Sequence, residues 1–499
     1  MLYHSSRDKS VEITASEAIV KGLCSDGGLF VPEEIPYLSL DEIVALGNMS
    51  YSERATEIFS LFLTDFRRNE IKDCTSKAYT KEKFETDTIA PIYKLNEHTY
   101  VLELWHGPTC AFKDMALQIL PYLLTTSMEK TGTDKKVAIL VATSGDTGKA
   151  ALEGFRDVPG TKIFVFYPTG GVSEIQKLQM QTQEGDNVGV YAIEGNFDDA
   201  QSGVKKIFSD VEFKEKLRER GYELSSANSI NWGRLLPQIV YYVSSYAELV
   251  KNKEISCGEE VNICVPTGNF GNILAAYYAK EMGVPIKTLI CASNSNNVLT
   301  EFIRTGVYNK NRAFVQTISP SMDILISSNL ERLLYHMSGE NSELVKELMA
   351  KLSEEGSYEV PDDIKAKLKE NFYAAYCDDK FTMRTISEIE RNYSYVMDTH
   401  TAVAENVYEQ YLAQTHDSTK TIIASTASPF KFSGSVVSAI MGEDDAPVTD
   451  DEFLLIERLS KIGNMTPPKS LAALKDKEVR FPDVTKKEEM ILRVNEFLA

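Results

Sequence analysis

Short apolar runs rich in β-branched residues alternate with helical stretches from about residue 135 onward. This alternation is typical of βαβ units, in which a helix carries the chain back so that successive strands lie parallel. The first series has strands predicted at 136–142, 162–167 and 188–193, each followed by a helical stretch. Successive units of this kind predict a small doubly wound α/β domain.

A second series of the same type begins after residue 230. We expect helices at 231–250 and 273–280, and strands at 261–266 and 286–292. The apolar run 421–425 resembles these strands, although it lies far away in the chain. A second, mostly parallel sheet is therefore expected.

The other segments are less regular. Helical patterns at 40–46 and 52–66, without a βα series, predict an N-terminal subdomain, and the charged stretch 338–380 predicts solvated helices on the outside. The expected organisation is an N-terminal subdomain at 1–95, a large domain built from 96–135 and 228–499, and a small α/β domain at 136–227.

The chain is acidic, with 53 basic and 73 acidic residues and a formal net charge of −20. This charge argues against nucleic acid and against anionic membranes as partners, because both attract basic surfaces. No apolar stretch approaches the length of a membrane span, and the N-terminus has no apolar core of a secretory signal, so we expect a cytoplasmic protein. The seven cysteines have no CxxC spacing and the six histidines are scattered, so reduced thiols and no metal site are expected.

A Gly-x-x-Gly turn, Gly268 to Gly271, follows one predicted strand and opens into a helix. Glycines let the backbone approach an anion, and the free N–H groups at a helix start attract phosphate. An ordinary structural turn explains the same pattern. The turn is neither a Walker A loop nor a Gly-x-Gly-x-x-Gly loop.

A second turn of this kind is Thr143-Ser-Gly-Asp146-Thr-Gly148. Its hydroxyls and glycines are suited to an anion such as a carboxylate, but Ser, Thr and Asp are also the common helix-capping residues. Two such turns at the carboxyl ends of strands suggest a ligand with two acidic groups, or a cofactor beside a substrate.

Lys113 follows apolar residues near the predicted start of a helix. Partial desolvation and the positive end of the helix dipole both lower the pKa of an amine, which would suit a nucleophile or a base. The alternative is a surface lysine that pairs with Asp114 or another acid.

The segment around this lysine, His106-Gly-Pro-Thr-Cys-Ala-Phe-Lys113-Asp, closely resembles the pyridoxal-phosphate attachment segment of the threonine synthase family. Further similar segments occur in the family's order: Ser25-Asp-Gly-Gly-Leu-Phe-Val-Pro, Thr143-Ser-Gly-Asp-Thr-Gly, Asn228-Ser-Ile-Asn-Trp-Gly-Arg234, Pro266-Thr-Gly-Asn-Phe-Gly-Asn, Ser319-Pro-Ser-Met-Asp-Ile, Asp398-Thr-His-Thr-Ala and Thr426-Ala-Ser-Pro-Phe-Lys-Phe. The length is similar to that of the longer bacterial and fungal branch. The resemblance implies an α/β fold of the tryptophan synthase β-like type (pyridoxal-phosphate fold type II), with two doubly wound, mostly parallel sheets and an added N-terminal subdomain.

The resemblance also implies a cofactor, pyridoxal 5′-phosphate, and a role for each matching residue. Lys113 would bind the cofactor covalently and act as the catalytic acid and base. The cofactor phosphate would lie on Gly268, Asn269, Phe270, Gly271 and Asn272, and Thr426 would contact the pyridine nitrogen. Thr143, Ser144, Asp146 and Thr147 would hold the substrate carboxylate or lie beside the cofactor's 3′-oxygen. Asn228, Ser229, Asn231 and Arg234 would bind a substrate phosphate.

Two positions depart from the family pattern. Thr399 stands where proline is usual, which we expect only to loosen a turn, and Ser428 stands where histidine is common, close to Thr426. His400 and the segment 322–326 are interpreted as structural.

The implied activity is that of a threonine synthase, which converts O-phospho-L-homoserine and water to L-threonine and phosphate. Two alternatives stay open: a related phospholyase that releases 2-oxobutyrate, and a catalytically silent relative that binds a phosphorylated amino acid. We expect a monomer or homodimer without activation by S-adenosylmethionine.

Overall fold

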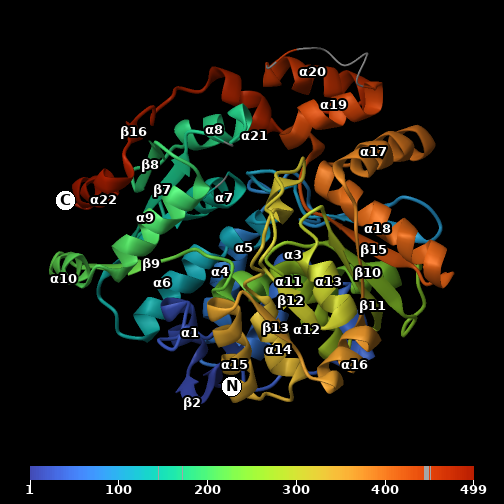
Figure 1. The fold of residues 1–499 in the computed structure, drawn as a ribbon, viewed down its shortest axis with the longest axis horizontal. Coiled ribbons are helices and arrows are strands. Elements are labelled where there is room, and N and C mark those ends of the chain that lie inside the picture. The colour runs from blue at the N-terminus through green and yellow to red at the C-terminus, as the bar shows by residue number, and fades with distance from the viewer. Residues whose placement is uncertain (144, 171, 443–448, 450) are drawn as a thin grey trace.

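Two sheets form the framework of the computed structural model, which describes residues 1–143, 145–170, 172–442, 449 and 451–499 (Figure 1). The larger sheet has six strands, in the order β14 (Phe372–Tyr376), β11 (Ile286–Ser293), β10 (Val261–Pro266), β15 (Thr421–Ser425), β5 (Thr99–Glu103) and β4 (Ile92–Lys94). All neighbours in it are parallel except β4 and β5. Residue Ser144, one of the predicted site residues, lies outside the described residues.

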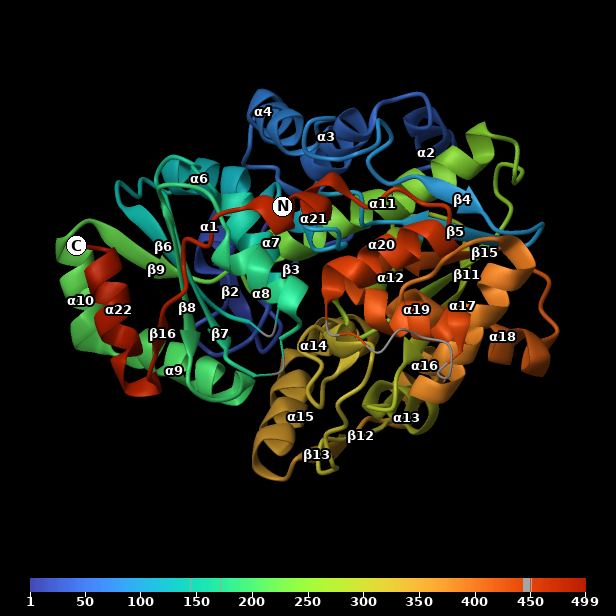
Figure 2. The same ribbon diagram turned by 90° about the horizontal axis from the view of Figure 1, so that it is seen from above.

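The smaller sheet has five strands, all parallel, in the order β16 (Val484–Thr485), β8 (Val188–Ile193), β7 (Thr161–Pro168), β6 (Lys136–Ala142) and β9 (Tyr222–Ser225). The expected large domain ran to residue 499, but the C-terminal strand β16 pairs with β8 of the small sheet. Figure 2 shows the two sheets side by side, with α22 (Met490–Phe497) beside the small one.

The predicted strands agree closely with the structure. The expected bounds of β6, β8, β10 and β15 are those observed, and β7 and β11 are slightly longer than expected. The stretch 338–380 is only partly helical: it contains α15 (Ser342–Glu354) and α16 (Asp362–Asn371), but also β13 (Ser357–Glu359) and the edge strand β14. The prediction of outer helices alone was therefore wrong for this stretch, because the short Phe-Tyr-Ala-Ala-Tyr run of β14 is flanked by charged residues that obscure its pattern.

Helices cover both sheets. Those near the small sheet are α6 (Leu120–Lys130), α7 (Asp146–Phe155), α8 (Glu174–Gln181), α9 (Phe197–Ser209) and α10 (Val211–Glu219). Those of the large part are α13 (Val298–Thr305), α14 (Leu330–Met337), α17 (Asp379–Tyr393), α18 (Thr399–Thr415), α19 (Ser433–Met441), α20 (Glu452–Ile462) and α21 (Lys469–Ala472). Within the described residues, no helix combines the length and the apolar character that a bilayer span requires.

The N-terminal residues form a small three-stranded sheet of β1 (Tyr3–Ser5), β2 (Asp8–Ile13) and β3 (Phe30–Pro32), with one helix between β2 and β3 and further helices after β3. These helices are α1 (Ala15–Lys21), α2 (Leu40–Leu46), α3 (Tyr51–Phe62) and α4 (Arg68–Ala78). The expected helix 40–46 is confirmed, and the sheet is an element that the sequence did not predict. The ring of Tyr3 packs edge-on against Trp232, with 5.3 Å between centroids, and so joins this subdomain to the central core.

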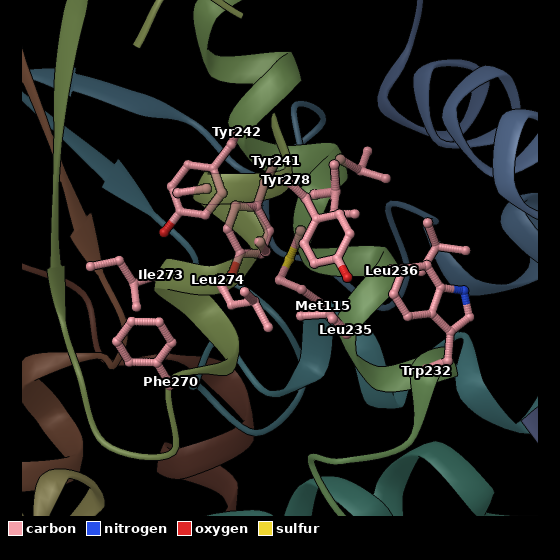
Figure 3. Close-up of a cluster of buried hydrophobic side chains, with 14 of the residues drawn as sticks. Met115, Trp232, Leu235, Leu236, Tyr241, Tyr242, Phe270, Ile273, Leu274 and Tyr278 are labelled. Atoms are coloured by element: carbon pink, nitrogen blue, oxygen red, sulfur yellow. The ribbon is translucent and has the colours of Figure 1, made fainter. Parts of the chain in front are cut away.

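The central core holds two parts of the predicted site in place (Figure 3). The almost entirely buried helix α11 (Trp232–Lys251) contributes Trp232 and Tyr241 to it, and α12 (Gly271–Glu281) contributes Tyr278. Met115, in the short helix α5 (Asp114–Leu117), and Phe270, just before α12, belong to the same cluster. Because Lys113 immediately precedes α5, one packed cluster supports both the lysine and the Gly-x-x-Gly turn.

Candidate active site

Lys113 lies in the interior, next to the start of α5. Its side chain is 13% exposed, and its Nζ donates a hydrogen bond to Ser321 Oγ at 3.3 Å. The alternative of a surface lysine is wrong, because Lys113 is largely buried, and the acid nearest its amine is Asp146. The buried Asp114 carboxylate instead accepts hydrogen bonds from the backbone N–H and the hydroxyl of Thr109, at 2.8 and 2.7 Å. Asp114 therefore fixes the loop that precedes Lys113.

Burial lowers the pKa of Lys113 below that of a free lysine. The nearby cations Lys431 and Arg234 lower it further, whereas Asp146, with its Oδ2 3.6 Å from Nζ, acts in the opposite direction. The net direction favours an uncharged amine, the form that acts as a nucleophile or a base.

The turn before α7 is tightly organised around Thr143. Its Oγ1 accepts hydrogen bonds from the backbone N–H groups of Gly145 and Gly148, at 3.0 and 2.9 Å. Gly145 has a φ of 146°, which other residues rarely adopt. Thr147 is half-buried.

Asp146, the first residue of α7, faces cations. Its Oδ1 lies 2.6 Å from Lys431 Nζ and accepts a hydrogen bond from Gln176 Nε2 at 2.9 Å. Burial opposes ionisation of Asp146, but Lys431 and then Lys113 outweigh burial and lower the pKa of this carboxyl. The ionised side chain repels a substrate carboxylate, so Asp146 itself is poorly suited to bind one.

The Gly-x-x-Gly turn has the geometry of a phosphate cradle. Phe270 adopts a left-handed conformation, with a φ of 62°, and caps the start of α12. A Cβ atom added to Gly268 would lie 2.7 Å from the carbonyl oxygen of Ser321, so only glycine fits there. Asn269 is exposed, and its carbonyl accepts hydrogen bonds from the backbone and the side chain of Asn329, both at 3.1 Å.

Asn272, in the first turn of α12, has a side-chain amide that is only partly hydrogen-bonded. Its Oδ1 accepts hydrogen bonds from the hydroxyls of Tyr241 and Tyr242. Its buried Nδ2 has no partner among the described residues. A buried donor without a partner costs free energy, which an anion bound at the start of α12 would recover.

Arg234 lies in the first turn of α11 and is buried. Its guanidinium donates to the carbonyl of Ala227 at 2.5 Å, while its Nε has no partner, and no carboxylate pairs with it among the described residues. Burial lowers the pKa of Arg234 to about 10. An arginine buried without a counter-ion is suited to an anionic ligand.

The three residues predicted beside Arg234 differ in their settings. Asn231 caps α11 through Gly233 N–H, at 2.8 Å, and donates to the carbonyl of Ile19 at 2.9 Å, so its side chain is already used in the fold. Ser229 is half-buried and Asn228 is exposed.

Thr426 follows β15 and lies beside the Lys113 loop. Its carbonyl accepts a hydrogen bond from Phe112 N–H at 2.8 Å, which joins it to the residue before Lys113. The departure Ser428 is buried and caps the short 3-10 helix η2 (Pro429–Phe432). At the other departure, Thr399 is the buried first residue of α18, and the Asp398 cap before it is intact.

Three residues to which the sequence analysis gave no functional role lie in this site: Ser321, Lys431 and His400, which was interpreted as structural. The Ser321 hydroxyl accepts a hydrogen bond from Lys113, and the backbone N–H of Ser321 donates one to His400. Lys431 forms an ion pair with Asp146. Each belongs to a segment that resembles the family, and that resemblance is the signal that could have found them.

Three family models match successive parts of the chain. They are described as threonine synthase N terminus, at residues 2–79, pyridoxal-phosphate dependent enzyme, at 86–361, and threonine synthase, C-terminal, at 401–494. The middle match includes Lys113, the Gly-x-x-Gly turn and Arg234.

The relatives agree with these models. Threonine synthase-like 1 of Homo sapiens is 41% identical over 451 residues, which are 88% of this chain and 60% of that protein, so the chain spans well under two thirds of this relative's length. Threonine synthase of Pseudomonas aeruginosa is 38% identical over 449 residues, 89% of this chain and 92% of that protein.

The crystal structure of threonine synthase from Brucella melitensis, which contains pyridoxal phosphate, superposes with a TM-score of 0.88 at 34% identity, covering 100% of this chain and 98% of that one. The expected fold type II and the expected cofactor are thereby confirmed. The chain belongs to the threonine synthase family, and its middle part matches the model of pyridoxal-phosphate dependent enzymes.

Proposed function

We propose that this chain converts O-phospho-L-homoserine and water to L-threonine and phosphate. The observation that carries the proposal is Arg234: a buried guanidinium without a counter-ion, close enough to Lys113 to lower the pKa of that amine. The Gly-x-x-Gly turn already provides one phosphate site, for the cofactor. A second buried anion site beside the reactive amine is what a phosphorylated amino acid requires.

The residues around Lys113 are suited to pyridoxal phosphate. The N–H groups at the start of α12 and the unpartnered Asn272 Nδ2 would hold its phosphate, and the close approach at Gly268 would shape the loop. Thr426 would face the ring nitrogen. Bound there, the cofactor supplies an electron-withdrawing ring that stabilises negative charge next to the substrate amine.

The chain's own groups perform the proton transfers and hold the substrate. Lys113, whose pKa is lowered by burial, takes and returns protons at the substrate carbons, and Ser321 Oγ holds its Nζ in place between transfers. Arg234 orients the phosphate and stays with it after the bond to carbon breaks. The start of α7, which the Thr143 turn shapes, would receive the carboxylate, because N–H groups at a helix start attract anions.

The decisive experiment is a product assay. Purified protein with pyridoxal phosphate and O-phospho-L-homoserine is assayed for threonine, 2-oxobutyrate and phosphate together. We expect threonine and phosphate in equal amounts, and neither with Lys113→Ala. Phosphate with 2-oxobutyrate would mean a phospholyase, and wild-type protein that binds the substrate without forming product would mean a silent relative.

A phospholyase that releases 2-oxobutyrate is the second candidate, on one observation. The human relative is 41% identical, whereas the Pseudomonas threonine synthase is 38% identical, and the former bears the name threonine synthase-like. The cytoplasmic location, the oligomeric state and the lack of activation by S-adenosylmethionine stay predictions.

A further inference from the structure

Three ionisable side chains, those of Lys113, Asp146 and Lys431, form a cluster inside the site, in which the two oxygens of Asp146 lie near the two lysines. They come from three separate segments, the loop before α5, the start of α7 and the 3-10 helix η2. Their side chains are 13%, 5% and 0% exposed. The cluster therefore contains one carboxylate and two lysines in a setting where charges are costly.

The distances separate the two lysines. Lys431 Nζ lies 2.6 Å from Asp146 Oδ1 and donates to the carbonyl of Thr109 at 3.0 Å. Lys113 Nζ lies 3.6 Å from Asp146 Oδ2, longer than a hydrogen bond, and donates to the neutral hydroxyl of Ser321. Among the described residues, Lys431 thus has a carboxylate and a carbonyl within hydrogen-bond distance, whereas Lys113 has only a hydroxyl at that distance and a carboxylate farther away.

We propose that Lys431 is a positioning residue that neutralises Asp146 and thereby leaves the amine of Lys113 free to be uncharged. One carboxylate compensates one buried cation. With Lys431 in place, a proton on Lys113 would add a second cation that nothing balances. Without Lys431, Lys113 would become the partner of Asp146 and would hold its proton more tightly.

The other charged groups near Lys113 agree with this assignment. Arg234, from α11, repels a proton on the amine. The carboxyl of Asp114 is bound by Thr109, and burial raises its pKa to about 6. His400, which reaches Lys113 through Ser321, accepts a hydrogen bond at Nε2 and so is uncharged.

The test measures the proton affinity of Lys113 directly. The full-length chain, freed of pyridoxal phosphate, is acetylated with trace acetic anhydride over a series of pH values, and mass spectrometry follows the peptide that carries Lys113. Only the uncharged amine reacts, so the midpoint of the labelling curve is its pKa. Added pyridoxal phosphate should block this peptide, which identifies the labelled amine as the one in the site.

We expect Lys431→Met to raise the midpoint by about one pH unit or more, a roughly tenfold loss of uncharged amine at a given pH below it. Asp146→Asn should lower the midpoint, and the double variant Asp146→Asn with Lys431→Met should cancel the rise. Lys431→Arg keeps the cation and should leave the midpoint near that of the wild type. An unchanged or lower midpoint in folded Lys431→Met would overturn the proposal.

Lys149→Met is the matched control, because Lys149 is buried like Lys431 and lies on α7, the helix of Asp146, but it pairs with Glu153 at 3.2 Å. Its loss should leave the Lys113 midpoint unchanged. If Lys431→Met does not fold, the proposal is tested with the double variant and with Lys431→Arg. A Lys113 labelling midpoint raised above that of the wild type in both would refute the proposal.

The inference rests on the proposed function only in taking Lys113 as the reactive amine. Labelling reads the amine without turnover, so the expected shifts in a protein that makes no threonine would support the inference and refute the reaction alone. In the loaded enzyme, the acid limb of kcat/KM against pH should move in the same direction as the midpoint.

Discussion

Nε2 of His400 accepts a hydrogen bond from the backbone N–H of Ser321, at 3.1 Å. Because a backbone N–H can only donate, Nε2 carries no proton. The other ring nitrogen, Nδ1, then donates to Asp398 Oδ1 at 2.9 Å. This neutral imidazole fixes the residue whose hydroxyl holds Lys113, although His400 itself does not touch the amine.

Replacing His400 by Ala should lower kcat about tenfold, with a smaller effect on KM, because losing one buried hydrogen bond costs about 1 kcal/mol and frees Ser321. Steady-state kinetics with O-phospho-L-homoserine measures both constants. The control is His416→Asn, at the exposed C-terminal end of the same helix, where the left-handed φ of 53° suits asparagine. Equal kcat values in both variants would contradict a positioning role.

Replacing Gly268 by Ala should weaken the binding of pyridoxal phosphate about 10- to 100-fold. The new methyl group would lie 2.7 Å from the Ser321 carbonyl and push the cradle apart, at a cost of about 1–3 kcal/mol. Equilibrium titration followed by cofactor absorbance measures the affinity. Gly434→Ala is the control, since its methyl group would meet only Leu455, at 3.7 Å, and it should bind the cofactor as tightly as the wild type.

Replacing Arg234 by Lys should raise the KM for the phosphorylated substrate at least about tenfold, because an ammonium cannot reproduce the planar guanidinium fork. Inhibition by inorganic phosphate should weaken in parallel. Arg54→Lys removes a second buried guanidinium, which pairs with Glu248 at 2.7 Å. Arg54→Lys should lower the free energy of unfolding and leave KM unchanged. A wild-type KM in Arg234→Lys would show that Arg234 does not bind the substrate.

Glu405 should make the protein less stable as the pH rises. This buried carboxyl of α18 has an oxygen without a partner among the described residues, and burial raises its pKa to about 8. A raised pKa in the folded state means that the stabilising contribution is complete below the unfolded pKa, near 4.5, and is lost as pH rises through about 8.

The variant Glu405→Gln should therefore match the wild type near pH 5 and exceed its unfolding free energy near pH 8, by on the order of a few kcal/mol. Urea unfolding at both pH values measures the difference. Glu97→Gln, at an exposed position, should follow the wild type at each pH. Parallel curves for Glu405→Gln and the wild type would show that Glu405 is not protonated in the fold.

Buried parallel strands were the part of the fold best predicted from sequence, because covering both faces turns each strand into a continuous apolar run, as in β6 and β10. Strands β1 and β3 are only three residues long and lack such a run. The position of β14 at a sheet edge depends on its pairing with β11, which local pattern does not encode.

The site divides in the same way. Lys113 and the Gly-x-x-Gly turn stand out because their chemistry is local: a helix start beside an apolar loop. The pairing of Asp146 with Lys431 cannot be predicted from local sequence, because Lys431 lies far away in the chain and contacts Asp146 only when the parts that carry the two sheets pack together. A lysine between two phenylalanines, as in Phe430-Lys431-Phe432, gives no sign that it is completely buried.

The pairing of β16 with β8 has a consequence for synthesis on the ribosome. In Figure 1 the C-terminal segment runs from α21 past α8 to reach that edge. The nascent chain thus carries β8 for nearly three hundred residues before residues 484–485 emerge, and for that time its outer N–H and C=O groups have no β16 to pair with. An unpaired strand edge is a template for aggregation. We therefore expect chaperone binding to matter most for this protein until translation is nearly complete.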